Sequence, residues 1–396
     1  MSAAALESRS ASLVEALRPE AHHAPTSGIV EVRNYGMGRD GLIPMWVGEG
    51  DLATPPFITE AATRSLAAGE TFYTWQRGIP DLRQALADYH GRLFGMPFSP
   101  ERFFVTGGGM QAIQIAARMV AGVGDEVLVP TPAWPNFAAA VGVNGARAVA
   151  VKMELKDRAW TLDLAKLAAA VTPRTRAIFI NSPANPTGWT ATRDELAAIL
   201  ALARKYGLWI IADEIYGRFV YGADKRSPSF HDVMADDDRI IFVQTFSKNW
   251  AMTGWRIGWI ETSPALGDVI ENLIQYSTSG VAVFMQRAGI AALERGDGFL
   301  EHQIARAKKN RDILEEGLGG SNRISFARTE GAFYLFLGVD GFDDSMALAK
   351  RLIDEANVGL APGTAFGAGG EKYLRLCFAR RTEDIEETVQ RIARFL

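Results

Sequence analysis

Two short apolar runs, AIFIN at residues 177–181 and WIIAD at residues 209–213, decide the fold class of this chain. Each run is continuously apolar up to its last residue, which is typical of a strand that is covered on both faces of a parallel sheet. Between them, residues 194–206 have the apolar spacing of an amphipathic helix. A strand, a helix and a second strand in this order predict a βαβ unit.

The same alternation begins near residue 51 and continues through most of the chain. Further predicted strands and helices lie at residues 102–106, 126–130 and 239–244, and at residues 110–120 and 163–170, respectively. The pattern therefore predicts an α/β fold, with a mainly parallel central sheet that is flanked by helices.

The last third of the chain has a different pattern. Predicted helices at residues 286–293, 302–317 and 384–396 are mixed with apolar runs at residues 331–337 and 372–378. This is an α+β pattern, and 396 residues exceed the usual size of one hydrophobic core. We expect a large domain over residues 49–290 and a smaller domain built from residues 1–48 and 291–396, with the first 25 residues as a loosely attached arm.

Charge and cysteine content exclude several classes of protein. The formal net charge is -4 and no basic stripe occurs, so no nucleic-acid partner is expected. Cys377 is the only cysteine, and His90, His231 and His302 lack the spacing of metal ligands, so no disulfide within the chain and no metal are expected. Residues 1–20 lack the apolar core of a signal peptide, and no run of about 18 apolar residues occurs, so we expect a cytoplasmic protein without a membrane span.

Polar and small residues follow the predicted strands, at the edge of a parallel sheet where ligands bind. GGGM at residues 107–110 follows one strand, and an Asn185-containing turn follows another. Asp213 closes a third strand and is followed by Tyr216, and Lys248 follows a fourth, between two aromatic residues.

Each of these features also has an ordinary structural explanation. The glycines could form a tight turn, Asp213 could cap a helix, and Lys248 could be a surface lysine that lies along aromatic side chains. Together, however, they supply an anion-binding loop, an amine nucleophile, a buried carboxylate, a phenol and an amide. A phosphorylated aldehyde that carries a pyridine ring needs this set of groups.

The segment TFSKNWAMTGWRIG at residues 245–258 resembles the lysine signature of the class I/II aminotransferases, in the aspartate aminotransferase superfamily of fold type I. Thr245 stands where that family usually has Gly or Ser. Further ordered matches, which extend the resemblance over nearly the whole chain, are GEGDLATP at residues 48–55 (with Gly50 where proline is usual), Tyr73 with GIPDLR at residues 78–83, NPTG at 185–188, DEIY at 213–216 and YLRL at 373–376.

The resemblance implies that pyridoxal 5'-phosphate is the cofactor. Lys248 would hold it as a Schiff base and then move the substrate's Cα proton. Asp213 would face the pyridine nitrogen, Asn185 and Tyr216 would donate to the 3' oxygen, and Trp134 would stack on the ring.

The resemblance also implies the phosphate and substrate contacts. The phosphate would be bound by the backbone of Gly108, Gly109 and Met110, and by the side chains of Thr245, Ser247 and Arg256. Tyr73 would reach the phosphate of a neighbouring subunit, in a homodimer with shared active sites. Arg375 would pair with the substrate carboxylate, helped by the backbone of Gly48 and by Asn185. Cis peptide bonds are expected at Thr131–Pro132 and Asn185–Pro186.

The predicted function is the reversible transfer of an amino group from an L-amino acid to a 2-oxo acid by ping-pong chemistry. A carbon–sulfur lyase on the same fold is the main alternative, since no motif fixes which bond at Cα breaks. A non-catalytic regulator that binds the cofactor is a further alternative, but the first 45 residues are too short and too weakly basic for a DNA-binding domain. A nicotinamide dehydrogenase would need a dinucleotide-binding glycine motif, which residues 107–111 do not provide.

The choice of substrate stays open in the sequence. Some dicarboxylate enzymes of the family have a lysine where Met110 stands. Met110, Trp75 and Phe284 favour an apolar side-chain pocket, whereas Arg33, Arg39 or Arg77 could serve an acidic substrate.

Overall fold

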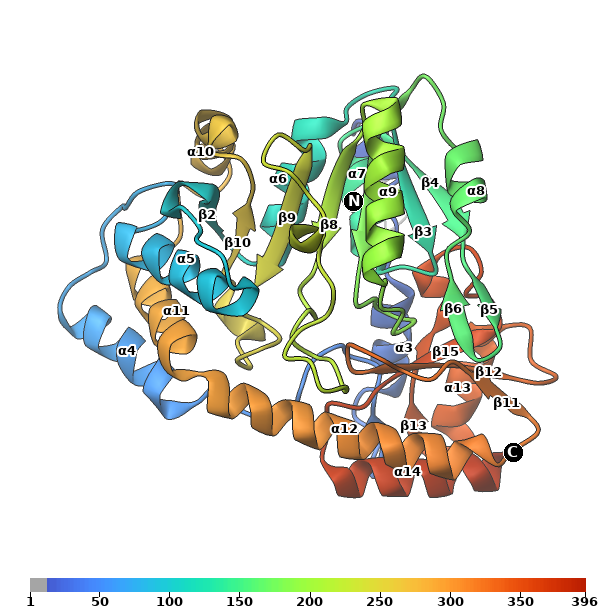
Figure 1. The fold of residues 1–396 in the computed structure, drawn as a ribbon. Helices are drawn as coiled ribbons and strands as arrows, with labels where there is room; N and C mark the ends of the chain where they lie inside the picture. Colours follow the sequence, from blue (N-terminus) through green and yellow to red (C-terminus); the bar gives the residue numbers. More distant parts are fainter. Residues whose placement is uncertain (1–12) are drawn as a thin grey trace, which may run out of the picture.

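The central feature of the computed structural model, which describes residues 13–396, is a seven-stranded sheet with the order β2-β10-β9-β8-β7-β3-β4 (Figure 1). Its strands are β2 (Phe103–Thr106), β3 (Glu126–Thr131), β4 (Arg147–Lys152), β7 (Thr175–Asn181), β8 (Trp209–Asp213), β9 (Ile240–Thr245) and β10 (Gly258–Glu261). The neighbours from β4 to β9 are parallel, and β10 is antiparallel to both β9 and β2. The predicted mainly parallel sheet is confirmed.

Helices cover both faces of this sheet, because its strands are apolar on both sides. Ala177 and Phe179 of β7 lie in one core with helices α6 (Gly109–Val120), α7 (Pro135–Val143) and α10 (Gly267–Gln275). Ile178 and Ile180 point the other way, into a core shared with α8 (Leu164–Ala169) and α9 (Arg193–Tyr206). Figure 1 shows α9 in front of the sheet and α6 and α7 behind it.

A third apolar cluster lies at the β2 edge of the sheet. Phe103 and Val105 of β2 pack there with helices α4 (Pro56–Ala67), α5 (Pro80–Phe94) and α11 (Val283–Arg295). Trp250, close to Lys248 in sequence, is also fully buried in this cluster. The segment that carries the candidate lysine is therefore anchored by large side chains on a rigid part of the molecule.

The C-terminal part forms a separate antiparallel sheet with the order β11-β12-β15-β14. Its strands are β11 (Ile324–Phe326), β12 (Tyr334–Val339), β14 (Ala361–Pro362) and β15 (Tyr373–Cys377). The C-terminal part also contains the helices α12 (Asp297–Gly319), α13 (Ser345–Ala356) and α14 (Thr382–Phe395). Figure 1 shows the long helix α12 running from α11 to this sheet. No helix in the described part of the chain is long and apolar enough to cross a membrane.

The N-terminal segment packs on the C-terminal part. Helix α3 (Gly28–Gly36) contacts α13, and β1 (Ile43–Pro44) pairs in parallel with β13 (Val358–Gly359). This confirms a smaller α+β unit that combines both ends of the chain. Of the predicted N-terminal arm, residues 1–12 lie outside the described residues; the rest includes the short helix α2 (Pro19–His22). The remaining strands, β5 (Glu154–Lys156) and β6 (Ala159–Thr161), form a small hairpin.

Candidate active site

One cavity of about 230 Å³ lies where the carboxyl ends of the sheet strands meet the small C-terminal sheet. The predicted site residues that line it are Gly48, Gly109, Met110, Trp134, Asn185, Asp213, Tyr216, Thr245, Ser247, Lys248, Arg256 and Arg375. Two predicted residues do not line it: Gly108 lies just behind Arg256, and Tyr73 is 95% exposed on the segment between α4 and α5. The structure thus brings together nearly all the predicted residues within one chain.

The amine of the half-buried Lys248 is the nucleophile candidate on the cavity wall. Its Nζ donates a hydrogen bond to the carbonyl oxygen of Gly48 at 2.8 Å. Burial lowers the pKa of Lys248 to about 8, because the charged ammonium loses its solvation. A larger fraction of this amine is therefore unprotonated near neutral pH than for an ordinary lysine.

Asp213 contributes a buried carboxylate to the same cavity. It is 2% exposed, and its side chain accepts a single hydrogen bond among the described residues, from the Ile215 backbone at 3.4 Å. Burial raises the pKa of Asp213 to about 7, and the positive charge of Lys248 opposes this shift. A carboxylate held in this way has an unused acceptor position, which favours a protonated nitrogen as its partner.

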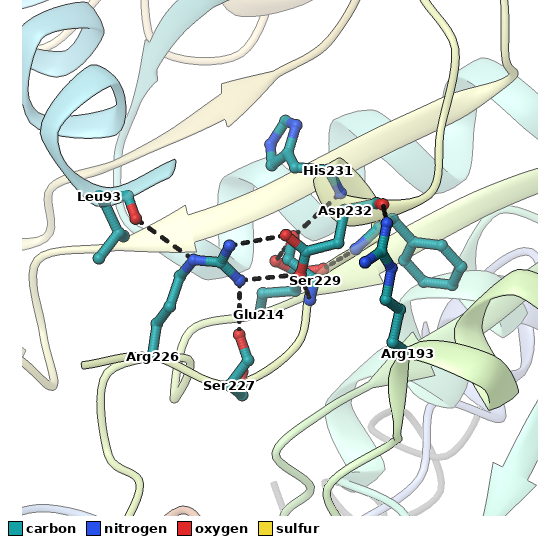
Figure 2. Close-up of polar contacts among 9 residues, drawn as sticks. Leu93, Arg193, Glu214, Arg226, Ser227, Ser229, His231 and Asp232 are labelled. Atoms are coloured by element: carbon teal, nitrogen blue, oxygen red, sulfur yellow. Dashed lines mark hydrogen bonds and ion pairs between the residues drawn. The ribbon is translucent and has the colours of Figure 1, made fainter. Parts of the chain in front are cut away.

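A second carboxylate, that of Glu214, holds the turn that follows Asp213 on the side away from the cavity. Glu214 accepts hydrogen bonds from the Ser229 hydroxyl at 2.7 Å and from the backbone N–H of Phe230 at 3.1 Å. The loop that carries Ser229 is held by an ion pair between Arg226 and Asp232, with N–O distances of 2.8 and 2.6 Å (Figure 2). Asp213 therefore projects from a turn that is anchored on the side away from the cavity.

An anion-binding corner lies at the start of helix α6. Gly108 has φ +83° and a methyl group there would meet Nη2 of Arg256 at 2.6 Å, so the loop and the guanidinium are in close contact. The Thr245 hydroxyl donates to the Ser247 hydroxyl at 2.9 Å. Hydroxyl groups, a guanidinium and a helix N-terminus together form a suitable site for a phosphate.

Arg375 approaches the cavity from β15 of the small sheet. It is 2% exposed, and its Nη1 donates to the Asn185 Oδ1 at 3.1 Å. Its Nη2 donates to the carbonyl oxygen of Trp46, and its buried Nε has no partner in the part of the protein that the structure describes. A buried guanidinium with a free donor beside a cavity is suited to a carboxylate ligand.

Some features of the site were not predicted. Tyr334, Thr253, Asn181 and Ile29 also line the cavity. The peptide bonds Thr131–Pro132 and Asn185–Pro186 are cis as expected, and Ser182–Pro183 is cis as well. Tyr334 lies within a predicted apolar run, where an aromatic residue indicates a core position, so its sequence context gave no sign of a role in the site.

The cavity suits pyridoxal phosphate in three respects. The carboxylate of Asp213 has an unused acceptor position, the loop at Gly108 has no space for a side chain beside Arg256, and Lys248 offers a desolvated amine. Among residues 13–396, no group of three His, Cys, Asp or Glu side chains could hold a metal ion. The fold and the cavity together define a pyridoxal-phosphate-dependent enzyme of fold type I.

The comparison with family models gives the more particular identity. Residues 41–392 match the family described as aminotransferase class I and II, and the chain belongs to this family. It is a transaminase that uses pyridoxal phosphate and acts on amino acids and 2-oxo acids.

Relatives from several organisms are similar along most of their length. An aspartate/prephenate aminotransferase of Thermus thermophilus is 33% identical over 387 residues, which cover 97% of each chain. An arginine–pyruvate transaminase of Pseudomonas aeruginosa is 34% identical over 353 residues, 89% of each chain. Among solved structures, an aspartate aminotransferase from Thermotoga maritima has a TM-score of 0.89 and 32% identity, and the match covers 96% of this chain and 99% of that one.

Proposed function

We propose that Lys248, Asp213 and Tyr216 carry the catalysis of transamination. The observation that supports this most strongly is that an amine with a lowered pKa and a carboxylate with a raised pKa line the same cavity. When bound, pyridoxal phosphate supplies an aldehyde for covalent attachment and a ring that accepts the electrons of the Cα–H bond. The Lys248 amine then serves as the base that takes the Cα proton and returns it.

The remaining residues of the cavity bind and orient. Gly109 and Met110 would offer backbone N–H groups to the phosphate, and Thr245, Ser247 and Arg256 would offer side-chain donors. The N–H of Gly108, which we expected to join them, donates instead to the carbonyl oxygen of Thr106 at 2.8 Å. Asp213 would pair with the ring nitrogen of bound pyridoxal phosphate, and Tyr216 and Asn185 would donate to its ring oxygen. Trp134 would cover the ring and exclude water.

We assign substrate carboxylate binding to Arg375, Asn185 and the backbone of Gly48. The free Nε of Arg375 and its bond to Asn185 support this assignment. A guanidinium binds a carboxylate through two parallel hydrogen bonds. Arg375 would therefore contribute to the affinity for the substrate and also fix the position of the substrate's Cα relative to Lys248.

We further propose that the substrates have uncharged side chains. The cations on the cavity wall are Lys248, Arg256 and Arg375, and the functions above occupy all three. Arg33, Arg39 and Arg77 do not line the cavity; Arg77 binds Glu271 and Asp268, and Arg39 binds Asp354.

The cavity wall near the substrate position is largely apolar. It is formed by Met110 together with Ile29 and Val47, whereas Trp75 and Phe284, which we expected there, lie outside the cavity of the single chain. On the described residues of this chain, a second substrate carboxylate would be desolvated against these side chains without a cationic partner, which is unfavourable.

A donor screen tests this function and its substrate class. Amino acids with uncharged or charged side chains are added singly to the enzyme, and the loss of the cofactor's aldehyde-form absorbance is followed, with pyruvate and 2-oxoglutarate as acceptors. We expect leucine or phenylalanine to exceed aspartate in kcat/KM by about tenfold or more, and Met110→Lys to narrow that gap. If aspartate is the best donor, the substrate class is wrong; if no donor converts the cofactor, transamination by this site is wrong.

We also propose that the protein is a cytoplasmic homodimer with shared active sites. Exposed aromatic side chains on one edge of the molecule support the dimer: Phe72 is 84%, Tyr73 95% and Tyr276 85% exposed. A second copy would cover this edge and bring Tyr73 to the partner's phosphate site. Cys377 is a buried free thiol, which suits a reducing compartment.

For the division of the chain, we retain the proposal of a large domain over residues 49–290 and a small domain over residues 1–48 and 291–396. Helix α11 continues to Arg295 and α12 begins at Asp297. The interruption between these two helices, at Gly296, supports a junction within a few residues of the expected boundary.

A further inference from the structure

Tyr334 occupies a central position in the active-site cavity. It begins strand β12, is fully buried and lines the cavity. Strand β12 pairs with β15, which carries Arg375, in a register that places Phe336 opposite Arg375. Tyr334 lies two residues before Phe336 in the strand. Its side chain is therefore on the same face of the sheet as those of Phe336 and Arg375.

The ring of Tyr334 supports the guanidinium of Arg375. The Cζ atom of Arg375 lies over the Tyr334 ring at 4.7 Å from its centroid and over the Phe366 ring at 4.9 Å. Stacking on aromatic rings restricts a planar guanidinium to one orientation. With Nη1 bound to Asn185, the orientation of the carboxylate-binding edge is set before a substrate arrives.

The hydroxyl of Tyr334 lies on the cofactor side of the same cavity. Its oxygen is 2.7 Å from the hydroxyl oxygen of Tyr216, a hydrogen-bond distance in which either phenol can donate. A methyl group on Gly48 would overlap this hydroxyl, so the hydroxyl packs directly against the residue whose carbonyl accepts the Lys248 amine. One side chain thus contacts the supports of both the cofactor lysine and the substrate carboxylate.

We propose that Tyr334 is a positioning residue that acts through two separate groups: its ring orients Arg375 for the substrate, and its hydroxyl directs the proton of Tyr216 towards the cofactor. The proposal rests on the function proposed above for Arg375 and Tyr216. Each phenol has a single proton to donate. If Tyr334 donates to Tyr216, the proton of Tyr216 is free for an acceptor inside the cavity. The hydrogen bond from Tyr334 to Tyr216 then strengthens the one that Tyr216 donates to this acceptor.

Three variants separate the two groups. Tyr334→Phe keeps the ring and removes the hydroxyl, Phe366→Leu removes the other ring that contacts Arg375, and Tyr334→Leu removes both groups of Tyr334. Two properties are measured for each holoenzyme: the pKa of the cofactor's visible absorbance without substrate, and KM for an amino donor. The first reports on donation to the cofactor oxygen, and the second on the carboxylate site.

For Tyr334→Phe, we expect the absorbance pKa to rise by about 0.3 unit or more, because a weaker donor at the ring oxygen leaves the neighbouring imine nitrogen more basic, with KM changed less than about twofold. For Phe366→Leu, we expect KM to rise about fivefold with the absorbance pKa unchanged. Tyr334→Leu should show both changes. Thermal unfolding of each apoprotein checks folding, and if Tyr334→Leu does not fold, the other two variants decide.

An unchanged absorbance pKa in Tyr334→Phe overturns the role of the hydroxyl. An unchanged KM in the foldable ring variants overturns the role of the ring. Failure of the underlying function looks different: Arg375→Leu would then leave KM unchanged, and Tyr216→Phe would leave the absorbance pKa unchanged.

The contact with Gly48 gives an independent check. Gly48→Ala should lower thermal stability and cofactor loading, and adding Tyr334→Phe should restore part of both, because the nearest ring atom that remains, Cζ, is 3.2 Å from the new methyl position. If the double variant is no better than Gly48→Ala, the hydroxyl does not pack against Gly48 as described.

Discussion

The amine of Lys248 donates a hydrogen bond to the carbonyl of Gly48, although the two residues are 200 positions apart in the chain. Lys248 follows a strand of the large sheet, and Gly48 belongs to the N-terminal segment that packs on the small C-terminal unit. The amine is therefore enclosed from both sides, and this enclosure lowers its pKa to about 8. The predictions below depend on this enclosure and on the groups around it.

Borohydride reduction of the holoenzyme should fix the cofactor on the peptide that contains Lys248, which peptide mass spectrometry will show. Lys248→Ala should reduce turnover by about 10³-fold or more, because both the covalent attachment and the base are lost. Lys205→Ala changes a lysine in the last turn of α9 and should keep wild-type activity. Labelling of any other lysine would contradict the assignment.

Asp213→Asn should stabilise the apoprotein while it inactivates the holoenzyme. Since burial raises the pKa of Asp213 from 3.8 to about 7, the unfolded chain releases this proton at lower pH than the folded chain. The contribution of Asp213 to the free energy of unfolding therefore falls as pH rises from about 4 to about 7. The asparagine side chain that replaces it does not titrate, so the variant apoprotein should gain roughly 2–4 kcal/mol over wild type by pH 8.

Thermal or urea unfolding of the two apoproteins at pH 4, 6 and 8 measures this difference. Cofactor-loaded samples provide the contrast, because we expect Asp213→Asn to lower kcat by about 10²-fold or more. A gain in apoprotein stability that does not grow with pH would contradict the raised pKa.

Gly108→Ala should weaken cofactor binding beyond its effect on stability. Gly108 and Gly124 both have positive φ angles, +83° and +85°, but a methyl group at 108 meets Arg256 whereas none of the described atoms lies within 4 Å of one at 124. Both alanine variants should lose about 1 kcal/mol or more of stability from backbone strain. We expect the Kd for the cofactor to rise about tenfold or more in Gly108→Ala alone, measured by fluorescence titration of the apoprotein.

Mixed dimers test whether Tyr73 acts on the partner's site. Neither Tyr73→Ala nor Lys248→Ala homodimers should be fully active, but a hybrid of the two should have one site with both native residues. Unfolding and refolding the two variants together should therefore restore activity, up to the level given by one native site in each hybrid dimer. No recovery, with hybrids verified by native mass spectrometry, would show that Tyr73 does not complete the neighbouring site.

Local apolar patterns were sufficient for the main strands, whereas most of the cavity wall, including Trp134, Arg256 and Arg375, followed from the resemblance to the aminotransferase family. Continuous apolar runs predict β7 and β8 within two residues of their observed ends, since a strand buried on both faces has no polar position until it ends. Asp213 and Lys248 are recognisable for the same reason, as charged groups directly after buried strands.

The elements that escaped prediction depend on tertiary contacts. Strand β10 has four residues and pairs antiparallel between β2 and β9, and β4, at the edge of the sheet, buries only Val151 of its six residues. Helix α12 begins five residues before the predicted residue 302, at the exposed residues Asp297 and Gly298, and glycine does not favour a helix. Tyr334 could not be assigned to the cavity, because only the folded chain brings β12 against Tyr216.

Arg375 reaches the cavity from the small sheet, whereas the groups suited to the ring and phosphate come from the ends of the large one. Every amino donor shares the carboxylate that we assign to Arg375, whereas the apolar wall at Met110, Ile29 and Val47 faces the part in which donors differ. For a protein engineer, strands β12 and β15 are therefore the part of the site to leave unchanged when a new donor is sought.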